Sequence, residues 1–80
     1  MGIFSRGYDD DAISQAARNV IKQDPVVKLS GIQVVAEDGV LELMGKVRAE
    51  RYKQKIINKI EDKLAKEGIK YEQIKNNLST

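Results

Sequence analysis

GIQVVAEDGVLELMGKV, residues 31–47, is the stretch that decides the fold. Apolar and polar side chains alternate on both sides of Asp38-Gly39, and an Asp-Gly pair between two such runs is the strongest short-range signal of a β-hairpin with a two-residue type I′ turn. The turn sets the register, so that Glu37 lies opposite Val40 and one face of the hairpin is apolar. That face consists of Ile32, Val34, Ala36, Leu41, Leu43 and Val47.

The other face of the hairpin is half polar and is expected to meet water or a partner. It carries Gln33, Val35, Glu37, Val40, Glu42 and Met44. Exposed apolar clusters often mark protein interfaces, which makes Val35, Val40 and Met44 candidate protein-interaction residues. Apolar residues scattered singly over a surface need no such explanation.

A helix is predicted before the hairpin. Three consecutive aspartates at residues 9–11 precede a run with helical spacing, and we expect one of them to cap the helix. They lack the alternate spacing of a calcium-binding loop. Asp24-Pro25 ends the run. The apolar positions are Ile13, Ala16, Ala17, Val20 and Ile21.

A second helix and a third strand are predicted after the hairpin. The helix runs from about residue 48 to residue 66, and Gly68 is placed to end it in the left-handed conformation. Its apolar face carries Ala49, Tyr52, Ile56, Ile57, Ile60 and Leu64. Residues 69–78 are predicted as a strand with Ile74 and Leu78 inward, and Val27 and Leu29 are expected under the sheet.

The order helix, strand, strand, helix, strand predicts an α+β fold with two helices packed on one face of a three-stranded mixed sheet. We expect a split βαβ unit with spatial strand order 2-1-3, in which strand three lies beside strand one and runs parallel to strand two. Strand two is then an open edge. Residues 1–8 are interpreted as an N-terminal tail and residues 9–80 as a single domain.

Composition excludes several classes of function. Among 80 residues there is no Cys and no His, so disulfides, thiolate metal sites and the common nucleophile relays are not expected. No paired carboxylates, nucleophile with base or phosphate loop is present, so we expect no enzyme and no cofactor. The sequence shows neither a secretory signal nor a transmembrane segment. We therefore expect a soluble, cytoplasmic protein, with peripheral attachment to the inner membrane left open.

The charge is polarised along the chain. Residues 1–40 carry four basic and six acidic side chains, whereas residues 41–80 carry ten basic and six acidic ones. On a helical projection the basic residues of the second helix fall in a row beside its apolar face, with Glu50, Glu61 and Asp62 on the far side. Lys46 and an uncapped helix start add a possible anion site. The candidate anion- or lipid-binding residues are Lys46, Arg48, Arg51, Lys55, Lys59, Lys63 and Lys66.

Three interpretations of this row are open: a solvated face that promotes solubility, a docking surface for anionic lipid headgroups, and a nucleic-acid site. A nucleic-acid site would need aromatic side chains for base stacking, and the four aromatic residues form no paired strand motif. They are Phe4, Tyr8, Tyr52 and Tyr71.

The chain resembles the BON domain family, named for bacterial osmotically induced and nodulation proteins, over about residues 10–79. The resemblance rests on the Asp38-Gly39 turn, the run Val40-Leu41-Glu42-Leu43-Met44-Gly45-Lys46-Val47, the pair Gly68-Ile69 and the closing Ile74-Lys75-Asn76-Asn77-Leu78. Residues 69–74 form a longer segment than is usual in the family, and Arg48 or Ala49 stands where such domains often have a capping Ser, Asp or Asn.

The resemblance implies a non-enzymatic module that binds phospholipid or membrane surfaces, often within stress-response or envelope proteins. Some cytoplasmic relatives are linked to potassium binding. The combined expectation is a binding module that uses the basic row against anionic membranes. The alternatives are a protein-interaction or structural adaptor that uses the outer sheet face or an edge strand, and small-cation sensing. A monomer is favoured over a homodimer.

Overall fold

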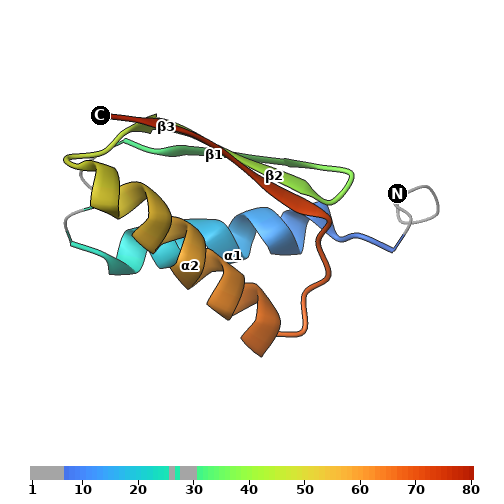
Figure 1. Cartoon of the computed structure of the whole chain (residues 1–80). Helices are drawn as coiled ribbons and strands as arrows, with labels where there is room; N and C mark the ends of the chain where they lie inside the picture. The colour runs from blue at the N-terminus through green and yellow to red at the C-terminus, as the bar shows by residue number, and fades with distance from the viewer. Residues whose placement is uncertain (1–6, 26, 28–30) are drawn as a thin grey trace.

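Two helices cover one face of a three-stranded sheet in the computed structural model, which describes residues 7–25, 27 and 31–80 (Figure 1). The elements are α1 (Asp10–Gln23), β1 (Gln33–Glu37), β2 (Val40–Lys46), α2 (Glu50–Lys66) and β3 (Gln73–Ser79). The predicted α+β class, element order and two-layer arrangement are confirmed.

The hairpin has the predicted turn and register. Asp38 and Gly39 have φ angles of 52° and 82°, as a type I′ turn requires at both central positions. Glu37 lies opposite Val40 and Val34 opposite Leu43. The Asp-Gly pair therefore fixed which side chains of the hairpin face the helices.

The predicted strand order 2-1-3 is wrong, because the observed order is β1-β2-β3. The direction of β3 was predicted correctly, since it runs parallel to β2. Backbone hydrogen bonds hold both ends of β3 next to β2. The Glu72 N–H donates to the Gly39 carbonyl at 2.8 Å, and the Val47 N–H donates to the Ser79 carbonyl at 2.8 Å. Pairing with the seven residues of β2 gives β3 a longer ladder than the five residues of β1 offer. Strand β2 is consequently central, and the predicted open edge at β2 is replaced by edges at β1 and β3.

The core lies between the helices and the inner face of the sheet. Leu41 and Leu43 are fully buried, Val34 and Val47 are nearly so, and Ile32 and Ala36 pack against them from the rim. Leu78 is buried and Ile74 half-buried, as predicted for β3. Val27 is buried in the core, as expected, while Leu29, predicted beside it, lies outside the described residues. The helices supply the other core side chains, Ile13, Ala16, Ala17, Ile21, Ile56, Ile57, Ile60 and Leu64.

The helix ends follow from local sequence. Asp9 caps α1 by accepting the Ala12 N–H at 3.1 Å, which confirms that one of the three aspartates is the cap. Helix α2 ends in a Schellman motif around Gly68, whose φ is 65°, because the Ile69 N–H reaches the Leu64 carbonyl at 2.9 Å. The start of α2 at Ala49 has no side-chain cap, as the sequence indicated.

Candidate functional site: the basic face of α2

The predicted row of basic side chains does not form one uniform surface. Arg51, Lys55, Lys59, Lys63 and Lys66 lie on α2, beside its buried face. Arg48 is exposed but precedes the first helical residue, Glu50, so the helical spacing does not extend to it. Lys46 is the last residue of β2, and the alternation of side chains along the strand places it with Glu42 and Met44 on the outer side of the sheet, away from α2. The structure brings together the five helical residues and separates Lys46 from them.

Lys59 is part of a structural ion pair. Its Nζ lies 3.3 Å from Oδ2 of Asp24, whose residue exposure is only 7%. Oδ1 of Asp24 accepts the N–H of Val27 at 3.2 Å, so this carboxylate joins α2 to the chain that leaves α1. A buried carboxylate needs such a partner because desolvation of an unpaired charge is costly. Lys59 therefore has a structural role, as the ion-pair partner of Asp24.

The C-terminal part of the row is partly neutralised. Lys63 forms an ion pair of 2.7 Å with Glu67. Asp62, which the helical projection placed on the far side, in fact lines the same cleft between α1 and α2 as Lys59, Lys63 and Lys66. The Asp62 carboxylate therefore lies beside the same cleft as these lysines. This part of α2 is a mixed-charge surface.

In the N-terminal part of the row, two cationic side chains lie close to one aromatic ring. The Arg51 guanidinium carbon lies 5.2 Å from the ring centre of Tyr52, and the Lys55 Nζ lies 5.6 Å from it. Tyr52 is partly buried and packs against the core, as predicted. Neither Arg51 nor Lys55 has a carboxylate within 4.0 Å in the part of the chain that the structure describes. We call Arg51, Tyr52 and Lys55 the α2 cation cluster.

The uncapped start of α2 already has a negative charge in its first turn. Glu50 forms a 3.0 Å ion pair with Lys53, and the hydrogen bond and charge of Lys53, helped by a hydrogen bond from Thr80, hold the pKa of Glu50 below its ordinary value. A carboxylate at this position interacts favourably with the helix dipole. The first turn of α2 therefore already contains a carboxylate that compensates its uncapped N–H groups.

The outer sheet face is mixed in character. Val35 is 47% exposed, whereas Val40 and Met44 are half-buried. The Asn77 side chain donates to the Glu42 carboxylate, and Lys75 lies with Val35, Val40 and Glu42 around a shallow hollow. The three predicted interaction residues share this face with the polar residues Gln33, Glu37 and Glu42.

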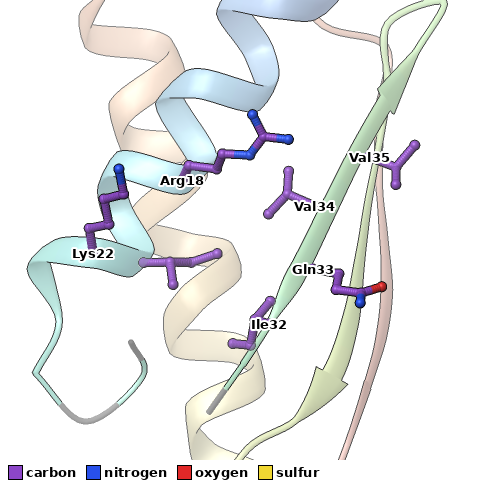
Figure 2. A pocket seen from close by; sticks show the side chains of 7 residues that line it. Arg18, Lys22, Ile32, Gln33, Val34 and Val35 are labelled. Carbon is purple, nitrogen blue, oxygen red and sulfur yellow. The ribbon is translucent and has the colours of Figure 1, made fainter. Parts of the chain in front are cut away.

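A groove that sequence reasoning missed runs between α1 and the edge strand β1. Arg18 and Lys22 reach across one side of it, while Ile32 and Val34 point toward the helix from the other (Figure 2). Gln33 and Val35 also line it and point to the opposite side of the strand. The helical spacing of Arg18 and Lys22 was the available signal, but their position beside an open strand edge depends on the sheet order.

Neither a metal site nor a membrane-spanning helix is found among residues 7–25, 27 and 31–80. These residues contain no group of three or more acidic side chains that could hold a metal ion. No helix in this described part of the chain is long and apolar enough to cross a membrane.

Comparison with known proteins gives one family. The BON domain model matches residues 9–65, which span α1, the hairpin and nearly all of α2. No curated protein and no solved structure matches the chain. The matched segment contains the Asp-Gly hairpin and both amphipathic helices, and β3 completes the same layer beyond it. The chain belongs to the BON domain family, a family of non-enzymatic binding modules.

Proposed function

We propose that this domain binds anionic phospholipid membranes through the α2 cation cluster, with Arg51 and Lys55 as the cations that meet the headgroups. The observation that carries the proposal is that these two exposed cations flank a half-buried tyrosine and lack an acidic partner among the described residues. Unpaired surface cations on a binding module are available to an external anion.

The chemistry of the cluster suits a membrane surface. Each Lys or Arg near an anionic bilayer contributes about 1 kcal/mol. Tyrosine is enriched at membrane–water interfaces because its ring is apolar and its hydroxyl polar. The ring of Tyr52 also keeps both cations close to one place on the helix, which reduces the entropy lost when they bind.

The proposed binding site contains fewer residues than the row of basic side chains predicted from the sequence. Lys59 is held by Asp24, Lys63 by Glu67, and Lys46 faces the other side of the sheet. These three residues are expected to add little to membrane binding. Arg48 and Lys66 remain accessory candidates at the two ends of α2.

The test is cosedimentation of the full chain with phosphatidylcholine vesicles, with and without phosphatidylserine, over a salt series. We expect binding only to the anionic vesicles, weakening as the Debye length falls from about 30 Å to about 8 Å. The variant Arg51→Gln with Lys55→Gln should lose most of this binding. The matched control, Lys46→Gln with Lys75→Gln, removes the same charge from the outer sheet face and should keep it.

Two results would overturn the proposal. One is the absence of binding to anionic vesicles at low salt. The other is an equal loss of binding in both double variants, because that would make net charge, and not the cluster, the determinant. Circular dichroism of each variant establishes that its fold is intact.

A further inference from the structure

The backbone of β1 presents an edge along which no other described strand pairs. In a hairpin with a two-residue turn, Glu37 and Val40 form a hydrogen-bonded pair, and such pairs alternate along an antiparallel ladder. Glu37, Val35 and Gln33 therefore bond to β2, while the N–H and C=O groups of Val34 and Ala36 point away from it. No described strand lies on that side, because β1 is first in the order β1-β2-β3.

The two edges of the sheet differ in how well they are protected. Natural edge strands commonly carry Lys, Pro or bulges that prevent pairing with another chain. Strand β3 contains Lys75 and two asparagines, whereas β1 reads QVVAE, with neither Lys nor Pro. The β1 edge also holds Val35, the one large exposed hydrophobic residue in the described part of the chain.

Helix α1 runs alongside this edge with opposite charges at its two ends. Its first turn lies at the hairpin turn, where the Asp10 carboxylate accepts the backbone N–H groups of Asp38 and Gly39. Its last turn lies at the start of β1, where Lys22 and Ile32 line the same groove (Figure 2). Acidic Asp11 and basic Lys22 thus mark the two ends of a helix that is antiparallel to β1.

We propose that β1 pairs antiparallel with β1 of a second copy of this chain, around a two-fold axis at Val35. In this register Val34 lies opposite Ala36 of the second copy, and Ala36 lies opposite its Val34. The backbone groups of both strands that point away from β2 then pair, and two three-stranded sheets join into one of six strands.

Charge complementarity singles out a second copy as the occupant of this edge. The two-fold axis makes the two α1 helices antiparallel, so that Asp11 lies toward Lys22 of the second copy and Lys22 toward its Asp11. On the outer face Gln33 lies opposite Glu37 of the second copy, and the two Val35 side chains meet on the axis. All three contacts place favourable partners together, and none brings like charges face to face.

The dimer also has a consequence for binding. The axis stands perpendicular to the joined sheet, so all four helices lie on the same side of it. The two α2 cation clusters then face the same way, which allows both to meet one planar surface. A short edge of five residues predicts weak association, in the range of transient complexes.

Sedimentation equilibrium of the full chain, from about 1 μM to about 1 mM, tests the association. We expect a monomer–dimer equilibrium that Lys22→Glu weakens at least several-fold, because it places Glu opposite Asp11. Asp11→Lys combined with Lys22→Glu should restore it. A chain that is monomeric throughout this range, or a double variant as weak as the single one, overturns the proposal.

Crosslinking tests the axis itself. In a non-hydrogen-bonded antiparallel pair the Cα atoms are about 4.5 Å apart, within the range that a disulfide spans. Because the chain has no cysteine, Val35→Cys introduces a single thiol, which should form a disulfide-linked dimer under mild oxidation. Val40→Cys, on the same face of central strand β2, is the matched control and should crosslink much more slowly. Equal rates for the two variants contradict the two-fold axis at Val35.

This experiment is independent of the membrane proposal. Arg51→Gln with Lys55→Gln changes no residue at the β1 edge and should leave dimerisation unaltered. Loss of vesicle binding with intact dimerisation, or the reverse, therefore shows which of the two proposals fails.

Discussion

Oδ1 of Asp10 accepts a hydrogen bond of 2.9 Å from the backbone N–H of Gly39, and its Oδ2 accepts one of 2.8 Å from Asp38. One carboxylate at the start of α1 thus satisfies both N–H groups of the hairpin turn. Bonds between a charged acceptor and backbone donors are stronger than neutral ones. This contact fixes the position of the helix against the sheet.

Asp10→Ala is expected to lower the free energy of unfolding by about 1–3 kcal/mol, because it leaves two backbone donors without their charged acceptor. The neighbouring Asp11→Ala is the control, since the Asp11 side chain has no such contact among the described residues, and it should cost clearly less. Urea denaturation of both variants measures the difference. Equal losses would mean that the two bonds contribute nothing beyond a general effect at the helix end.

Gly39→Ala is expected to destabilise the protein for two reasons. Its φ is 82°, and a Cβ there would lie 2.6 Å from Cγ of Tyr8, whose ring covers the turn. Gly68→Ala is the matched control because Gly68 also has a positive φ, of 65°, but open space around it. The left-handed conformation alone costs about 1–2 kcal/mol, so Gly39→Ala should lose more than Gly68→Ala.

The Tyr8→Ala background separates the two causes. Removing the ring abolishes the collision but not the backbone cost, so Gly39→Ala should then cost about as much as Gly68→Ala. Thermal and urea denaturation of the four variants provide the comparison. A penalty for Gly39→Ala that is unchanged without the ring would show that Tyr8 does not press on the turn.

Lys59→Met is expected to destabilise the fold by about 1–3 kcal/mol, because it removes the ammonium group 3.3 Å from the Asp24 carboxylate, whose residue is only 7% exposed. Lys63→Met breaks the Lys63–Glu67 pair, which is more exposed, and should cost at most about 1 kcal/mol. Urea denaturation at neutral pH measures both. Similar small losses would show that Lys59 is only a surface cation.

The pKa of Glu50 is expected to rise toward its ordinary value of 4.5 in Lys53→Met, because that variant removes the hydrogen bond and the charge that lower it. A lowered pKa in the folded state means that the pair contributes stability above the unfolded pKa, and that this contribution is lost as the pH falls through the folded pKa. NMR titration of the Glu50 side chain below neutral pH measures the shift. Identical titration curves for the two proteins would rule out Lys53 as its cause.

Local patterns predicted the individual elements well. Four predicted features depend on contacts within a few residues: the Asp38-Gly39 turn, the inward residues of the hairpin, an aspartate cap among residues 9–11 and the Gly68 helix end. Such contacts are encoded by side-chain alternation, helical spacing and the conformational freedom of glycine. The direction of β3 was predicted from the order strand, helix, strand, because such a crossover joins parallel strands.

Contacts between distant parts of the chain were not predictable in this way. Asp10 was one of three equivalent aspartates in the sequence, and only its place beside the hairpin turn distinguishes it. In the sequence Lys59 is one of a row of basic residues, and only the structure places the Asp24 carboxylate 3.3 Å from its ammonium group. A residue's partner across the core depends on how the layers pack, and sequence spacing does not specify this.

The sequence by itself determined the elements, the apolar faces and the family pattern, because each follows from local periodicity and turn chemistry. Only the tertiary structure decided that β3 lies beside β2, that β1 is an edge, and which cations of α2 lack acidic partners among the described residues. The physical reason is that strand order and ion pairing are set by the competition between alternative long-range contacts. In this chain the longer ladder along β2 and the buried Asp24 carboxylate fit the arrangement that is observed.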